Sequence, residues 1–201
     1  MCLPHLRSIR KQDRSGQYFM KNVLIGGIGN VLLGDDGVGP YLVRMIAAHY
    51  EFADGVEVID LGTPALEFVD NIAGRDAVIL IDSVKLDADP GSIALYRKAD
   101  LAAHAPSIRM DPHSPTLIEA IHSAEFYANP PSDVLLIGIV GASFEPSCTL
   151  SEAVQGSLSN ATREVLRELD RLGIGHCRRI KAADPDIWWT KAPALPSETH
   201  V

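Results

Sequence analysis

The sequence lacks any long apolar run: no stretch approaches the roughly 18 apolar residues of a membrane-spanning helix. Its first residues also lack the apolar core of a signal peptide. We therefore expect a cytoplasmic protein. Cysteine is scarce as well, since Cys2, Cys148 and Cys177 are scattered without C-x-x-C spacing. This spacing argues against a disulfide framework and a cysteine zinc site, and it predicts reduced thiols.

The motifs of common hydrolases are missing too. The chain has neither the G-x-S-x-G elbow of a serine nucleophile nor the H-E-x-x-H helix of a zinc peptidase. Cys148 lies in the segment Phe144-Glu145-Pro146-Ser147-Cys148, where a buried or incidental thiol fits better than a catalytic one. These absences leave a nucleophilic side chain poorly supported.

Net positive charge is missing from most of the chain. The formal net charge is −8, yet residues 1–21 hold five Lys or Arg and one acid, which leaves −12 for the remainder. Affinity for nucleic acid comes largely from Lys and Arg, so an acidic body of this kind is a poor nucleic-acid binder. Metal ions or a basic partner segment suit it better.

The hydrophobic pattern that is present predicts an α/β protein. At 201 residues and 46% hydrophobic content, the chain suffices for one domain with a core. Apolar or alternating runs of β-forming residues predict strands at 23–25, 56–60, 77–81, 92–97 and 133–140. Helical spacing predicts helices at 38–50, 65–72, 116–128 and 150–172. This order predicts a three-layer α/β/α sandwich with about five strands, mostly parallel with one antiparallel.

The two ends of the chain lack this periodicity. Residues 1–21 are polar and basic and are predicted to be a disordered N-terminal extension. Residues 22–173 are predicted to form the single domain, and 174–201 an irregular C-terminal tail. Within the tail, Trp188 and Trp189 are expected to cover part of the core surface rather than form a binding platform.

The segment 23–40, VLIGGIGNVLLGDDGVGP, reads as a strand, a glycine turn and an acidic helix start. One interpretation is the dinucleotide-binding motif G-x-G-x-x-G. Leu32, however, stands where the third glycine belongs, and the charges of Asp35 and Asp36 would repel a phosphate. A purely structural interpretation is that Asp35 caps the helix and Asp36 complements its dipole.

Three polar residues are expected to meet at one edge of the sheet. Asp36 follows the first strand, and Asp82 directly follows the buried run 77–81. His113 lies in a predicted long loop, 98–115, whose backbone is restricted by several prolines. The first and third strands of such sheets are often neighbours, and ligands bind at the carboxyl ends of the strands.

Two carboxylates and an imidazole at this edge would form a divalent-metal site suited to nickel or zinc. Each residue has a structural alternative: Asp36 at the helix dipole, Asp82 in a loop cap, and His113 as one of seven histidines. Asp60, at the end of another strand, could line the same cleft or cap the turn at Gly62.

Taken together, these motifs resemble the maturation endopeptidases of nickel-iron hydrogenases. The matching segments, in order, are Gly27-x-Gly29-Asn30-x-Leu32-x-x-Asp35-Asp36-Gly37-x-Gly39, Asp60-x-Gly62-Thr63, Ile81-Asp82-Ser83-Val84 and Pro112-His113. The Glu145-Pro146 loop and the helix after Leu150-Ser151 match as well, so the resemblance covers about residues 22–173.

The resemblance implies an aspartic-type endopeptidase that clips a short C-terminal peptide from the large-subunit precursor of a hydrogenase. It implies that Asp36, Asp82 and His113 are the catalytic, nickel-contacting residues, although some members carry glutamate where Asp36 stands. The nickel would be supplied by the bound precursor. Two other functions stay open: a non-cleaving assembly chaperone for nickel or the precursor, and a nucleotide-binding oxidoreductase with Asp60 on a ribose.

Overall fold

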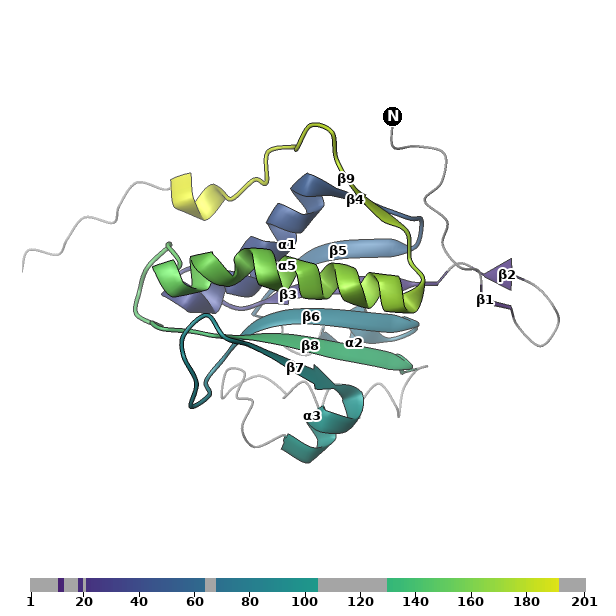
Figure 1. Cartoon of the computed structure of the whole chain (residues 1–201), viewed down its shortest axis with the longest axis horizontal. Coiled ribbons are helices and arrows are strands. Elements are labelled where there is room, and N and C mark those ends of the chain that lie inside the picture. Colours follow the sequence, from purple (N-terminus) through teal and green to yellow (C-terminus); the bar gives the residue numbers. More distant parts are fainter. Residues whose placement is uncertain (1–10, 13–17, 20, 64–67, 105–129, 192–201) are drawn as a thin grey trace, which may run out of the picture.

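A computed structural model describes residues 11–12, 18–19, 21–63, 68–104 and 130–191 (Figure 1). Five strands of this part form the central sheet: β3 (Val23–Ile28), β5 (Val56–Gly62), β6 (Ala77–Val84), β7 (Ile93–Arg97) and β8 (Asp133–Val140). Their order across the sheet is β5-β3-β6-β8-β7. The pairs β5-β3, β3-β6 and β6-β8 are parallel, and the edge strand β7 is antiparallel to β8. The predicted sheet is confirmed.

Helices cover both faces of this sheet. On one face, α1 (Val38–His49) and α5 (Glu152–Leu172) pack against alternate strand residues such as Ile25 and Ile79. On the other, α2 (Phe68–Ile72) and α3 (Lys98–His104) pack against the intervening residues, such as Leu24 and Leu80. This alternation follows from the two-residue period of a strand. Figure 1 shows α5 running along the length of the strands.

The central strands β6 and β8 are buried along nearly their whole length, as their continuous apolar runs predicted. The helix α5 has a defined start and end. The Ser151 hydroxyl caps it by accepting from the Val154 N–H, and Gly173 ends it in the left-handed conformation at φ 70°. The sequence therefore predicted both ends of the longest helix.

Three expectations about local structure were wrong. First, residues 98–104 are not loop but the helix α3, whose start is tied by the Arg97 N–H donating to Asp100. Lys, Ala and Leu are good helix formers. Leu101 belongs to this helix, and its side chain is buried. The prolines that suggested a loop lie downstream, in residues 105–115, which are outside the described residues, as is the predicted helix at 116–128.

Second, the strand that carries Asp82 does not end at Ile81. Its pairing with β3 stops at Gly27 and Ile81, but its pairing with β8 continues through Val84 and Val140. Asp82 and Ser83 therefore lie inside β6, on a part of the strand that projects beyond β3. A stepped sheet edge of this kind is not visible in a hydrophobic run, because the two polar residues interrupt the apolar pattern.

Third, the segment after Gly173 is not wholly irregular. The strand β9 (His176–Arg178) pairs antiparallel with the unpredicted strand β4 (Tyr50–Phe52), and a 3-10 turn, η3 (Trp188–Lys191), follows. Trp189 is buried and packs edge-on against Trp188, which is exposed, so only Trp189 covers the core as expected.

The predicted disorder of residues 1–21 falls largely outside the described residues. Within residues 1–21, the short strands β1 (Lys11–Gln12) and β2 (Tyr18–Phe19) pair antiparallel. Cys148 is a free thiol. In the ranges that the structure describes, no helix combines the length and the apolar character needed to cross a membrane.

Candidate functional site

The glycine-rich turn after β3 places Asp36 at the carboxyl end of the sheet. The chain leaves β3 at Ile28 and turns at Gly29, whose φ of 134° is open to glycine and strained for other residues. It then enters the 3-10 turn η1 (Gly34–Gly37), which leads directly into α1. The Asn30 N–H donates to Asp36 Oδ2 at 2.8 Å, so the turn itself orients this carboxylate.

Close backbone packing explains the other glycines of the segment. A Cβ at Gly39 would overlap the carbonyl oxygens of Ile28 and Ile81, and one at Gly27 would overlap the Gly39 carbonyl. The start of α1 thus rests directly on the ends of β3 and β6. The space beside these glycines is filled by the chain's own backbone, which argues against the dinucleotide interpretation of the motif.

Asp82 and Asp36 are both bonded to Ser83 where β6 projects beyond β3. The Ser83 hydroxyl donates to Asp36 Oδ1 at 2.9 Å, and the Ser83 N–H donates to Asp82 Oδ1 at 2.7 Å. Burial raises the pKa of Asp82 well above its ordinary value, the negative charge of Asp36 raises it further, and the bond from Ser83 opposes both. Asp36 and Asp82 therefore lie near each other at this edge of the sheet, and their catalytic or metal-binding role stays a prediction.

Asp35, the other half of the acidic pair, is fully buried and bonds to the 141–151 segment instead. Its carboxylate accepts from the N–H groups of Ala142, Ser143 and Ser151, at 2.7, 3.1 and 2.7 Å, and from the Ser151 hydroxyl at 2.8 Å. Burial alone would raise the pKa of Asp35, but these hydrogen bonds lower it below its ordinary value. Asp35 therefore clamps the 141–151 loop against η1 rather than capping a helix with its side chain.

Asp60 follows its structural alternative. Its Oδ1 accepts from the Gly62 N–H at 3.1 Å, which forms the expected turn cap. Its Oδ2 forms an ion pair with Arg44 on α1 at 3.2 Å. Arg44 also lies 3.7 Å from Asp186, so Asp60 helps to connect the C-terminal segment with the sheet.

His113 lies outside the described residues. The structure therefore places Asp36 and Asp82, and the three-residue metal site stays a prediction. Across 21–63, 68–104 and 130–191, no cluster of three or more His, Cys, Asp or Glu side chains could hold a metal ion. Ser83 was not singled out in the sequence, although its signal was available: it is a polar residue next to Asp82 within an otherwise apolar strand.

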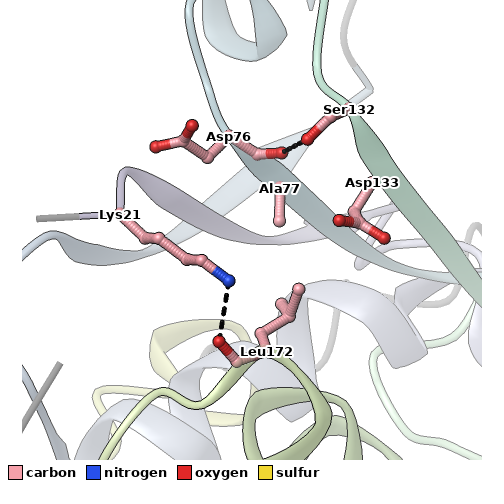
Figure 2. Close-up of a pocket in the computed structure, with 6 residues that line it drawn as sticks. All are labelled: Lys21, Asp76, Ala77, Ser132, Asp133 and Leu172. Atoms are coloured by element: carbon pink, nitrogen blue, oxygen red, sulfur yellow. Dashed lines mark hydrogen bonds between the residues drawn. The ribbon is translucent and has the colours of Figure 1, made fainter. Parts of the chain in front are cut away.

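A cavity of about 310 Å³ opens at the opposite edge of the sheet, beside Ala77 and Asp133, the first residues of β6 and β8 (Figure 2). Its polar groups pair with the protein itself. Lys21 Nζ donates to the Leu172 carbonyl at the end of α5, and the Ser132 hydroxyl donates to the Asp76 carbonyl, both at 2.8 Å. This cavity lies at the amino-terminal edge of the sheet, apart from Asp36 and Asp82.

Comparison with known proteins identifies the family. Residues 40–168 match the family described as hydrogenase maturation protease. The chain is 29% identical to the hydrogenase 2 maturation protease of Escherichia coli, over 76% of this chain and 93% of that protein. It is 31% identical to the hydrogenase expression/formation protein HoxM of Azotobacter vinelandii, over 76% and 74% of the two chains.

Solved structures give the same result. The hydrogenase maturating endopeptidase HybD from E. coli superposes with a TM-score of 0.73 and 28% identity, over 80% of this chain and 98% of that one. The two proteins share the α/β fold described above. The chain belongs to the hydrogenase maturation protease family and is a peptidase by that membership.

Proposed function

We propose that this protein is an endopeptidase that removes a short C-terminal peptide from the large-subunit precursor of a nickel-iron hydrogenase after nickel has been inserted. The observation that carries the proposal is that Asp36 and Asp82 both bond to Ser83 at the carboxyl edge of the sheet. In an open α/β sheet this edge is where ligands bind. The precursor is the substrate, and its nickel is part of what the enzyme recognises.

The chemistry of the pair suits a borderline divalent metal. Each oxygen of Asp36 accepts one described hydrogen bond, from Ser83 or Asn30, and a carboxylate oxygen retains a second lone pair for a ligand. A cation placed against both carboxylates would offset the like-charge repulsion that contributes to the raised pKa of Asp82. His113 would add an imidazole nitrogen, which nickel accepts readily.

The same carboxylates can move protons during hydrolysis. A carboxyl group whose pKa lies well above the ordinary value is a better base once ionised, and burial and the charge of Asp36 raise the pKa of Asp82 in this way. Either Asp36 or Asp82 could take the proton from the attacking water and return it to the leaving amine. The precursor's nickel would supply polarisation of the scissile carbonyl.

The test compares nickel-loaded with nickel-free precursor. Purified protein is mixed with each, and loss of the C-terminal peptide mass is followed by mass spectrometry. We expect cleavage of the nickel-loaded form alone and its loss in Asp82→Ala and His113→Ala. Cleavage that persists in both variants would remove these residues from the mechanism.

The same experiment distinguishes an assembly chaperone. A stable complex with the nickel-loaded precursor and no mass loss over the same period would favour binding without cutting. Cleavage of both precursor forms at the same rate would keep the peptidase assignment and remove nickel as the recognition element.

A further inference from the structure

Ser83 contacts both carboxylates of the candidate site. Its backbone N–H donates to Asp82 Oδ1 at 2.7 Å, and its hydroxyl donates to Asp36 Oδ1 at 2.9 Å. The residue is buried, with 8% of its surface exposed. We propose that Ser83 is a positioning residue that sets the orientation of Asp36 relative to Asp82, an inference that rests on the proposed function of this pair.

The need for such a residue follows from the stepped edge of the sheet. Beyond Ile81, β6 is paired with β8 and no longer with β3, so strand pairing on that side does not fix the distance to Asp36. Asp36 sits on a separate turn that leaves β3 after Ile28. The Ser83 hydroxyl is the described side-chain contact that joins the two pieces.

A neutral donor is well suited to this position. Together, Ser83 and the Asn30 N–H hold both oxygens of Asp36, which fixes the plane of the carboxylate. A Lys or Arg at position 83 would also hold the carboxylate, but its charge would compete with a metal cation for the pair. The serine hydroxyl orients Asp36 and leaves the negative charge of the pair uncompensated.

The two contacts of Ser83 can be separated by substitution. Ser83→Ala removes the hydroxyl and releases Asp36, while the backbone N–H to Asp82 is retained. Ser83→Thr restores a hydroxyl and adds a methyl group that suits a strand. Ser157→Ala is the matched control, because Ser157 is also buried and donates its hydroxyl, but to the Val154 carbonyl within α5.

The test measures the Asp36 carboxylate directly and then the reaction. The first readout is the ¹³C carboxyl resonance of Asp36 in the isolated protein, assigned with Asp36→Asn. We expect Ser83→Ala to shift this resonance, Ser83→Thr to return it toward its wild-type position, and Ser157→Ala to leave it unchanged. A resonance that is the same in wild type and Ser83→Ala would overturn the proposal.

The second readout is steady-state cleavage of nickel-loaded precursor. Loss of a hydrogen bond to a charged group predicts a fall in kcat of about 10-fold to 100-fold in Ser83→Ala, with KM within about twofold. Ser83→Thr should recover most of the rate. Equal rates in Ser83→Ala and Ser157→Ala would overturn the proposal. If wild type does not cleave but the Asp36 resonance shifts as expected, the proposed function fails and the positioning by Ser83 stands.

Discussion

Asp35 and Asp82 are both buried, yet their pKa values move in opposite directions. Asp35 lies in a clamp of three backbone N–H groups and a hydroxyl, which stabilise its ionised form. Asp82 is held by the Ser83 N–H and lies beside the negative charge of Asp36. Burial is common to both carboxylates, so the opposite directions of their pKa shifts come from hydrogen-bond donors and neighbouring charge. Donors favour a carboxylate that stabilises the fold, and a neighbouring negative charge favours one suited to chemistry.

The largest expected effect is on activity at the Asp82 side. Asp82→Asn keeps the size of the side chain and an oxygen for the Ser83 N–H, but it removes the carboxylate proposed as proton acceptor and metal ligand. We expect cleavage of nickel-loaded precursor to fall by about a thousandfold, in the range measured for acid-base groups. The rate is measured by mass spectrometry beside Asp87→Asn, an exposed control on the following loop. A rate within tenfold of that control would remove Asp82 from the chemistry.

The next effect is on stability at the Asp35 side. Asp35→Asn would turn an NH₂ group toward donors that now bind the carboxylate, in a site without solvent exposure. We expect a loss of about 3 kcal/mol in the free energy of unfolding, measured in urea at pH 7. The exposed control Asp87→Asn should stay within about 0.5 kcal/mol of wild type. Similar losses in both variants would show that the clamp contributes little.

The pH dependence of stability should carry opposite signs for the two carboxylates. Hydrogen bonds lower the pKa of Asp35, so its contribution is present above the unfolded value of about 3.9 and is lost as pH falls through the lower folded pKa. The stability advantage of wild type over Asp35→Asn should therefore shrink as the pH falls below about 4.

For Asp82, burial and Asp36 raise the folded pKa, so its contribution is complete below about pH 3.9 and is lost as pH rises through the folded value. Asp82→Asn should gain stability relative to wild type as pH rises from about 4 toward neutral. Urea unfolding of wild type, Asp35→Asn and Asp82→Asn between pH 3 and 7 measures how each stability difference from wild type changes with pH. Changes of the same sign for the two variants would contradict the opposite pKa shifts.

The smallest effect concerns a third buried carboxylate, which belongs with Asp35 in this comparison. Glu168 on α5 accepts two bonds from Arg97, at 2.6 and 2.7 Å, which tie the edge strand β7 to the helix. It also accepts three bonds from Arg171, at 3.1, 3.1 and 2.8 Å. Glu168→Gln should cost about 1 kcal/mol of stability, because some hydrogen bonds survive the change. Precursor cleavage should keep its wild-type kcat, since these residues lie toward the amino-terminal edge of the sheet, beside Asp133. A tenfold fall in kcat would connect this ion-pair cluster with the reaction.

The sequence predicted the part of the site that depends on strand order. Asp36 and Asp82 each follow apolar strand residues, and the neighbouring positions of β3 and β6 bring them together. The four bonds to Asp35 could not be foreseen, because their donors lie more than 100 residues away along the chain. The pairing of β4 with β9 was missed for a related reason: two three-residue strands, distant in sequence, carry too little periodicity to be recognised.

Gly27 and Gly39 meet without a side chain between them, and this contact sets the spacing between β3 and the start of α1. Where side chains separate two elements, substitutions in the core can change the spacing by fractions of an ångström. Here the separation of strand and helix is governed by the radii of backbone atoms, which no substitution of a neighbouring core residue alters. The spacing between β3 and the start of α1 is therefore insensitive to substitutions elsewhere in the core. Asp36, which lies directly before α1, keeps its position for the same reason.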